Sequence, residues 1–347
     1  EDGIRRLLPA RDDALPLYVQ EQGSRVTKRG EVFEVWQGST RLAESRIFET
    51  SQVSLFGNIQ MTTQALGEAL GRGIPVTFFS SGGWFRGIAH GMTHKNAELR
   101  MAQFRVASSS KESLRLARAF TQAKIANCRV MIRRNHPQAP KETLVSLARL
   151  AGRAQSAESA QHLLGVEGLA ARLYYQVFSG LLKPRKEAGD WGFEFDGRNR
   201  RPPLDPVNAL LSYAYSLLAK DFTVTALVVG FDPYVGFYHQ PRYGRPALAL
   251  DLMEEFRPIV ADSVVIGAIN NGVIGSDDFL RRGAAVALKP EARRKFILAY
   301  EGRLDSLVTH PVFGYRISYR RVLEVQARLL ARHLAGELAA YPAFRTR

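Results

Sequence analysis

The period of the hydrophobic pattern changes near residue 94, and this change constrains the fold more than any other feature of the chain. Before it, short runs rich in β-branched and aromatic residues lie between glycines and polar breaks, which is typical of strands; they cover 17–19, 31–36, 53–56 and 74–79. One helical pattern interrupts them at 62–72, with Thr62 as its capping residue. After residue 94, apolar residues recur every three or four positions, which predicts helices over 95–106, 110–134 and 141–154.

These patterns predict an α+β protein with a small N-terminal β-rich domain and a larger, essentially all-α domain. We place the first at residues 16–93 and the second at 94–347, with a hairpin or loop around Gly272, Gly275 and Gly283 and a basic helix over 315–340. Residues 1–15 are charged and show no apolar period. We interpret them as a linker or the remnant of a fusion.

The charge of the chain indicates a polyanionic partner. Its net charge is +15, and the positive charge is concentrated in two regions. Residues 91–135 hold ten Lys and Arg against two acids, and residues 281–347 hold fourteen against five, which gives +8 and +9. Two basic regions on either side of an acidic segment favour a nucleic-acid path over a uniformly solvated surface.

Composition also excludes several classes of protein. Cys128 is the only cysteine, so neither a disulfide framework nor a cysteine-based zinc site can form within the chain. A reducing cytoplasm is therefore the expected compartment. No uninterrupted apolar run approaches the roughly 18 residues that span a bilayer, so we expect no membrane partner.

Residues 231–258 carry the group of side chains best suited to metal chemistry. A short helical pattern buries Leu248 and its periodic neighbours, and its Asp251, Glu254 and Glu255 are spaced to project together from another face. His239 precedes this helix by a short loop. An imidazole with carboxylates suits Mg²⁺ or Mn²⁺, and also Zn²⁺. The alternative is a solvated helix face with a loop histidine satisfied by hydrogen bonds.

Glu167 is the third element of this hypothesis. Its helical neighbours include Leu163, Ala170 and Tyr174, so the carboxylate lies within an apolar stripe. An unpaired charge there would lose several kcal/mol of hydration, so we expect Glu167 to be protonated, paired with an arginine, or bound to a metal. The residues alone do not choose among these states.

Four ordered segments resemble the motifs of the CRISPR-associated spacer-acquisition integrase, the "Cas one" endonuclease family. They are residues 162–172 (HLLGVEGLAAR), 200–213 (RRPPLDPVNALLSY), 230–239 (GFDPYVGFYH) and 248–258 (LALDLMEEFRP). The resemblance implies that Glu167, His239 and Glu254 hold a catalytic Mg²⁺ or Mn²⁺, with Asp251 as a further acidic residue of the site. Some relatives have Asp at the position of Glu254, which keeps the ligand type and changes the reach of the side chain.

The resemblance also implies an assembly. The β-rich domain would mediate a homodimer, a small "Cas two" protein would bridge two dimers, and a "Cas four" type nuclease is a further fused or associated partner. The weakly charged strands from Val32 to Phe56 are compatible with a pairing surface, and the alternative is that their apolar residues only fill the domain's own core. Residues 222–230 favour a strand by propensity, whereas the helical domain of the family implies a helix.

Two functions therefore remain. The first is a metal-dependent integrase that joins 3′-hydroxyl ends of short DNA duplexes to a CRISPR repeat by transesterification and nicks DNA as a side activity. The second is a noncatalytic nucleic-acid-binding scaffold. For either function we expect double-stranded DNA to contact basic residues, of which the candidates are Arg201, Arg245, Lys289, Arg293, Arg294 and Arg320.

Overall fold

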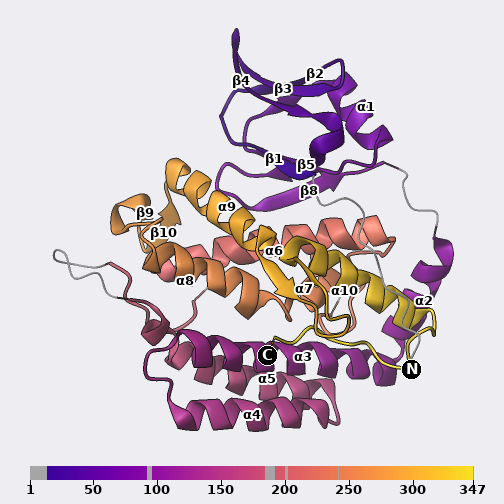
Figure 1. Ribbon diagram of the computed structural model, residues 1–347, viewed down its shortest axis with the longest axis vertical. Helices are drawn as coiled ribbons and strands as arrows, with labels where there is room; N and C mark the ends of the chain where they lie inside the picture. Colours follow the sequence, from indigo (N-terminus) through magenta and orange to yellow (C-terminus); the bar gives the residue numbers. More distant parts are fainter. Residues whose placement is uncertain (1–13, 92–95, 184–191, 200–201, 241, 347) are drawn as a thin grey trace. The chain divides into compact units, whose positions relative to one another are not determined.

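The protein consists of two compact units, one over residues 7–96 and one over residues 97–347. The computed structural model describes residues 14–91, 96–183, 192–199, 202–240 and 242–346. Strands dominate the first unit and helices the second, which confirms the predicted α+β class (Figure 1). The expected linker lies almost entirely outside the described residues, and the first strand begins at Leu15.

The N-terminal unit contains two four-stranded sheets and one helix. The first sheet has the order β1-β5-β7-β8, from Leu15–Val19, Thr50–Phe56, Val76–Phe79 and Phe85–Ala89. The second has the order β4-β3-β2-β6, from Thr40–Arg46, Val32–Gln37, Arg25–Arg29 and Gln60–Met61. Helix α1 (Thr63–Gly71) begins as predicted, because the Thr62 side chain accepts a hydrogen bond from the Ala65 N–H.

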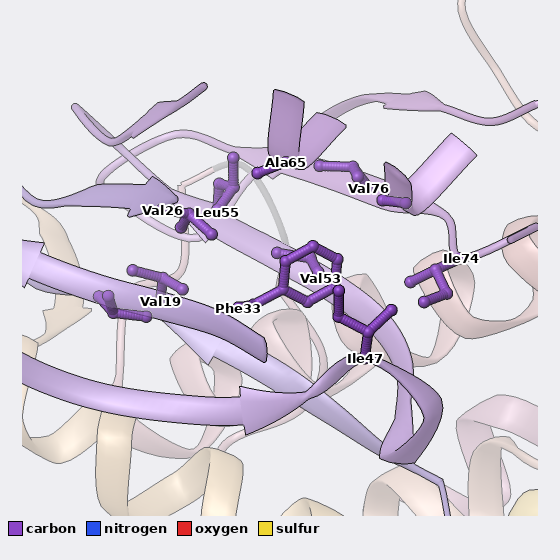
Figure 2. Close-up of a cluster of buried hydrophobic side chains, with 11 residues drawn as sticks. Val19, Val26, Phe33, Ile47, Val53, Leu55, Ala65, Ile74 and Val76 are labelled. Carbon is purple, nitrogen blue, oxygen red and sulfur yellow. The ribbon is translucent and has the colours of Figure 1, made fainter. Parts of the chain in front are cut away.

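The apolar residues of these strands form the core of the unit itself. Phe33, Ile47 and Val53 are fully buried and lie together with side chains of both sheets and of α1 (Figure 2). This is the alternative that the sequence left open for the weakly charged strands. The dimer through this domain stays a prediction.

The second unit is built from nine described helices and two short hairpins. The helices are α2 (Ala97–Ser108), α3 (Ser110–Asn135), α4 (Lys141–Gln155), α5 (Ala160–Gln176), α6 (Pro206–Val229), α7 (Ala247–Met253), α8 (Ser263–Asn270), α9 (Pro290–Asp305) and α10 (Tyr319–Leu334). The hairpins pair β9 (Phe279–Arg282) with β10 (Ala285–Leu288), and β11 (Leu307–Thr309) with β12 (Arg316–Ser318). Short 3₁₀ turns lie at Phe178–Leu181 and Ser276–Asp278 in this unit, and at Ile47–Glu49 in the N-terminal unit.

Helix α6 is the central helix of this unit. It is capped by Asp205, whose carboxylate accepts from the Asn208 N–H at 2.8 Å, and it is buried on most of its circumference. It continues through residues 222–229, so the strand propensity of its Thr and Val residues is overridden by burial among the surrounding helices. No helix of the described residues is both long and apolar enough to cross a membrane.

Helices α3, α4 and α5 pack side by side, as Figure 1 shows. Helix α7 packs against α6 and α3 and is followed by a π-helical segment, η3 (Arg257–Asp262). The candidate site lies where α3, α5, α7 and the loop before α7 meet.

Candidate metal centre

Asp251 organises the loop that carries His239. Its side chain is fully buried, and its Oδ2 accepts from the backbone N–H groups of Phe237 (2.6 Å) and Tyr238 (3.0 Å). Its Oδ1 accepts from the backbone N–H of His239 (2.8 Å) and from Nδ1 of the same ring (2.7 Å). Because Nδ1 donates to the carboxylate, the neutral imidazole keeps its lone pair on Nε2, which faces Glu254 Oε1 at 3.8 Å.

A glycine permits this close approach of loop and helix. A Cβ atom on Gly236 would lie 2.8 Å from Asp251 Oδ2 and 2.9 Å from Ala247. Both distances are shorter than van der Waals contact, so any larger residue would push the loop away from the carboxylate. The sequence of the loop therefore fixes where His239 points.

Glu254 occupies the turn that ends α7. The Glu254 N–H donates to the Asp251 carbonyl at 3.2 Å, and the Phe256 N–H donates to the Met253 carbonyl at 2.9 Å. The helix therefore ends in a tighter turn with hydrogen bonds from residue i to residue i−3. Pro258 has no N–H to continue the α-helical ladder, and the wider η3 turn begins beside it. The turn directs Glu254 toward His239, while Arg257 Nη1 holds Glu254 Oε1 at 2.7 Å.

Glu167 lies on α5 and reaches the same point from the opposite side. Its Oε2 accepts a hydrogen bond from the Tyr238 hydroxyl, and its Oε1 accepts one from the Lys124 ammonium of α3. The Lys124 Nζ also lies 2.6 Å from Glu254 Oε2. The predicted counter-charge for Glu167 is thus present, but it is a lysine instead of an arginine, and it contacts both carboxylates.

Electrostatic interactions within the cluster keep Glu254 and Lys124 ionised. Burial alone would raise the pKa of Glu254, but the positive charges of Arg257 and Lys124 bring it down to about 2. Burial opposes the charge of Lys124, yet Glu254 and Glu167 raise its pKa above the usual value. Burial and the neighbouring Glu167 both raise the pKa of Tyr238, so its hydroxyl remains a hydrogen-bond donor.

Glu255 does not belong to this cluster, and the prediction that it shares a face with Asp251 and Glu254 is wrong. Its carboxylate accepts hydrogen bonds from the Tyr341 hydroxyl at 2.6 Å and from the Phe344 N–H of the C-terminal segment. The reason is the tight turn after Met253, which rotates the residues away from the positions that a regular helix would give them. Burial raises the pKa of Glu255 to about 8.

A cavity of about 250 Å³ adjoins the cluster. Lys124 and Glu167 form part of its wall, and Cys128, Tyr215 and Asp262 line it further in. Tyr215 and Tyr174 donate hydrogen bonds to the buried Asp262 at 2.6 and 3.0 Å. Glu167 and Lys124 therefore face a space that is partly polar and large enough for a side chain or several water molecules.

The basic candidates for DNA binding lie in different settings. Arg201 is outside the described residues. Arg245 is half-buried just before α7, where burial and Arg242 lower its pKa. Arg294 is exposed on α9, in the turn that follows Lys289, and Arg293 beside it is half-buried.

Arg320 has carboxylate partners. Its guanidinium contacts Glu301 at 2.6 Å and Asp305 at 2.8 Å. These two charges offset its own, so Arg320 offers a phosphate less net positive charge than an arginine without carboxylate partners would. Contact with DNA stays a prediction for all six residues.

The donor types fit a hard divalent ion. The two carboxylates of Glu167 and Glu254 already hold a cation between them, and His239 Nε2 lies 3.8 Å from the other oxygen of Glu254. With Lys124 in place, no three His, Cys, Asp or Glu side chains of the described residues converge closely enough to hold an ion. The fit therefore rests on the chemistry of the donors and on the cation that they bind.

Comparison with known proteins places the chain in a family. Residues 17–302 match the family described as "CRISPR associated protein Cas1". A Cas4/Cas1 fusion of Geobacter sulfurreducens is 51% identical over 99% of this chain, which spans 62% of that relative. A Cas1 endonuclease of Thermus thermophilus is 40% identical, with 95% of this chain and 97% of the relative covered.

Solved structures share the fold. A Cas1 protein from Thermotoga maritima superposes with a TM-score of 0.81 at 22% identity, covering 94% of this chain and 99% of that one. A casposase bound to integration product gives 0.79 at 23% identity, covering 94% and 92%. The Cas1 part of a Cas6-RT-Cas1–Cas2 complex gives 0.79 at 24% identity, covering 99% of this chain and 37% of that one. By its sequence, the chain belongs to the Cas1 family of CRISPR-associated proteins.

Proposed function

We propose that this chain is a metal-dependent DNA integrase of CRISPR adaptation, which joins the 3′-hydroxyl ends of short foreign duplexes to a CRISPR repeat by transesterification. DNA nicking would be the same reaction with water as the nucleophile. The observation that carries the proposal is that Glu167 and Glu254, from separate segments, hold one cation between them beside a cavity, with His239 Nε2 lying 3.8 Å from Glu254 Oε1.

Each of these three side chains has a neighbour that fixes it. Asp251 holds the His239 ring, Arg257 holds one oxygen of Glu254, and Tyr238 holds one oxygen of Glu167. Each carboxylate thus has a second oxygen free of these neighbours and directed at the shared position. Such preorganisation allows binding without a large rearrangement of the chain.

The metal would be Mg²⁺ or Mn²⁺, held by Glu167, His239 and Glu254. When bound, it would polarise the target phosphodiester and stabilise the negative charge that develops on its oxygens. The residues of the chain would position the ion and exclude bulk water, while exposed basic residues would hold the DNA backbone.

The assembly that we propose follows from the reaction. Two 3′ ends must be joined at two phosphates, so a chain with one such site needs a second copy at a fixed distance. We propose a homodimer through the β-rich unit, bridged to another by a Cas2 protein, since a structural neighbour is a complex that contains Cas2. Because relatives that are 51% and 45% identical to this chain are Cas4/Cas1 fusions, an associated Cas4 nuclease is also proposed.

An integration assay tests the function. The reaction would contain a duplex donor with 3′-hydroxyl ends, a supercoiled target with the CRISPR repeat, and Mg²⁺ or Mn²⁺. Glu167→Gln, His239→Ala and Glu254→Gln should each abolish joining and leave most of the DNA affinity, because phosphate contacts elsewhere supply the binding energy.

Matched controls come from the surface of the same region. Glu158→Gln and His162→Ala alter exposed side chains at and near the start of α5 and should keep normal joining. Normal joining by all three site variants would contradict the proposal. DNA binding that survives EDTA, with no metal-linked reaction in the unaltered protein, would instead support the noncatalytic scaffold.

A further inference from the structure

Lys124 lies where a metal ion would have to bind. Its ammonium bridges Glu167 Oε1 and Glu254 Oε2, and the second contact is 2.6 Å long. Only 12% of the Lys124 side chain is exposed, with 18% of Glu167 and 2% of Glu254. A buried three-membered ion cluster of this kind is held by direct contacts and is little screened by salt.

An ammonium and a divalent ion cannot share this position. Metal–oxygen bonds of roughly 2.0–2.1 Å to Mg²⁺ would bring the ion against the lysine nitrogen if both touched the same two oxygens. Two like charges in contact at a buried point also repel each other strongly. Metal binding therefore requires the Lys124 side chain to leave.

The structure offers the side chain a place to go. Lys124 is part of the wall of the cavity of about 250 Å³, and its flexible four-carbon stem can turn within that space. Asp262 and the hydroxyl-bearing Tyr215 and Tyr175 line the same cavity. A displaced ammonium would thus have an anionic group and two hydroxyls within the same cavity, which Arg257 and apolar side chains also line.

We infer that Lys124 is a tethered cation that occupies the metal position in the metal-free protein and is displaced into the adjoining cavity when the divalent ion binds. The inference rests on the proposed metal site. In the metal-free state the ammonium neutralises two buried carboxylates and keeps them in their binding geometry. A divalent ion must compete with this ammonium for the two carboxylates. Lys124 therefore weakens metal binding while it stabilises the metal-free protein.

Substitution of Lys124 separates these two effects. Lys124→Met should lower the melting temperature of the metal-free protein and raise its affinity for Mn²⁺, measured by titration calorimetry, by roughly tenfold or more, since a buried competitor is removed. Lys124→Arg keeps a cation at the position and should bind Mn²⁺ no more tightly than the unaltered protein. If Lys124 only supports the bound state, Lys124→Met would bind Mn²⁺ more weakly, which would overturn the inference.

A double variant covers the case in which Lys124→Met does not fold. Lys124→Met combined with Glu167→Gln removes one charge of each sign, so the metal-free protein should regain most of the lost melting temperature. Failure to regain it would show that Lys124 stabilises the fold by packing alone, and the inference would fall.

Displacement itself is measured by lysine acylation and mass spectrometry. Without metal, two carboxylates hold the Lys124 ammonium and should slow its acylation; in Mn²⁺ the ammonium has left them and should react faster, whereas exposed Lys141 on α4 should react equally in both conditions. Unchanged protection of Lys124 at saturating Mn²⁺ would overturn the inference. If the unaltered protein binds neither Mn²⁺ nor Mg²⁺, the proposed function itself fails, which distinguishes the two outcomes.

Discussion

Replacing Asp251 should release the loop that carries His239 and lower the stability of the fold. Asp251→Ala leaves four donors without their acceptor: the backbone N–H groups of Phe237, Tyr238 and His239, and the His239 ring. A buried donor that loses its acceptor costs roughly 1–3 kcal/mol, and breaking a buried charged contact costs roughly 3–5 kcal/mol in measured cases. Because water can satisfy some donors at the loop, we expect a loss of roughly 3–5 kcal/mol.

A loss of this size is easily measured. For a unit of this length each kcal/mol lowers the melting temperature by roughly 2–4 °C, so Asp251→Ala should melt roughly 10 °C below the unaltered protein. Circular dichroism at a helical wavelength follows mainly the unit over residues 97–347, because the other unit is rich in strands. Asp251→Asn keeps one acceptor oxygen and should lose less stability.

Two further variants identify the cause. Gly236→Ala leaves the carboxylate intact but forces the loop away from it, so it should reproduce much of the loss. Glu158→Ala removes an exposed carboxylate from the segment just before α5 and should change the melting temperature by little. Loss of even one buried hydrogen bond should lower the melting temperature by more than about 2 °C. If Asp251→Ala melted within about 2 °C of the unaltered protein, Asp251 would not hold this loop.

Three other perturbations follow from the same contacts. Tyr341→Phe removes a hydrogen bond to the buried Glu255 and should cost roughly 1–3 kcal/mol in urea unfolding; no change would show that the C-terminal segment is not anchored there. Burial raises the pKa of Asp262 from 3.8 to about 6, so between these pH values the folded state binds more protons than the unfolded state, and the free energy of unfolding falls as pH rises. Asp262→Asn should flatten this part of the curve of stability against pH. An unchanged slope would show that Asp262 is not the titrating group. Arg294→Gln should lower the salt dependence of DNA binding by roughly one ion, and an identical dependence would place the DNA elsewhere.

The fold was predictable from sequence wherever the hydrophobic period was long and regular. Helices α3 and α4 begin and end close to the predicted residues because their apolar stripes are unbroken, and Ser109 also caps α3. The second half of α6 is the opposite case. Its Val and Thr residues favour a strand locally, and only the surrounding helices, together with the family resemblance, give a helix.

The candidate site was predictable in its anions and not in its cation. The criterion that singled out Glu167, a charge inside an apolar helical stripe, applies equally to Lys124. Its neighbours three and four residues away are the buried Phe120, Thr121, Asn127 and Cys128. Burying an unpaired lysine or glutamate costs several kcal/mol of hydration, so a buried lysine and a buried glutamate in two predicted helices are expected to pair with each other. Lys124 also lies in the basic region over residues 91–135, where its charge is equally compatible with DNA binding.

The separate roles of Glu254 and Glu255 show where sequence reasoning ends. The two residues are adjacent and chemically identical, yet one faces Lys124 and His239 while the other is anchored to Tyr341. Helical spacing assigns both to one face, and the error comes from assuming that the helix continues. Pro258 signalled the break, but a break does not say how far the following turn rotates each side chain. That rotation is set by contacts with α3 and the C-terminal segment, which are distant in sequence and appear only when the chain is folded.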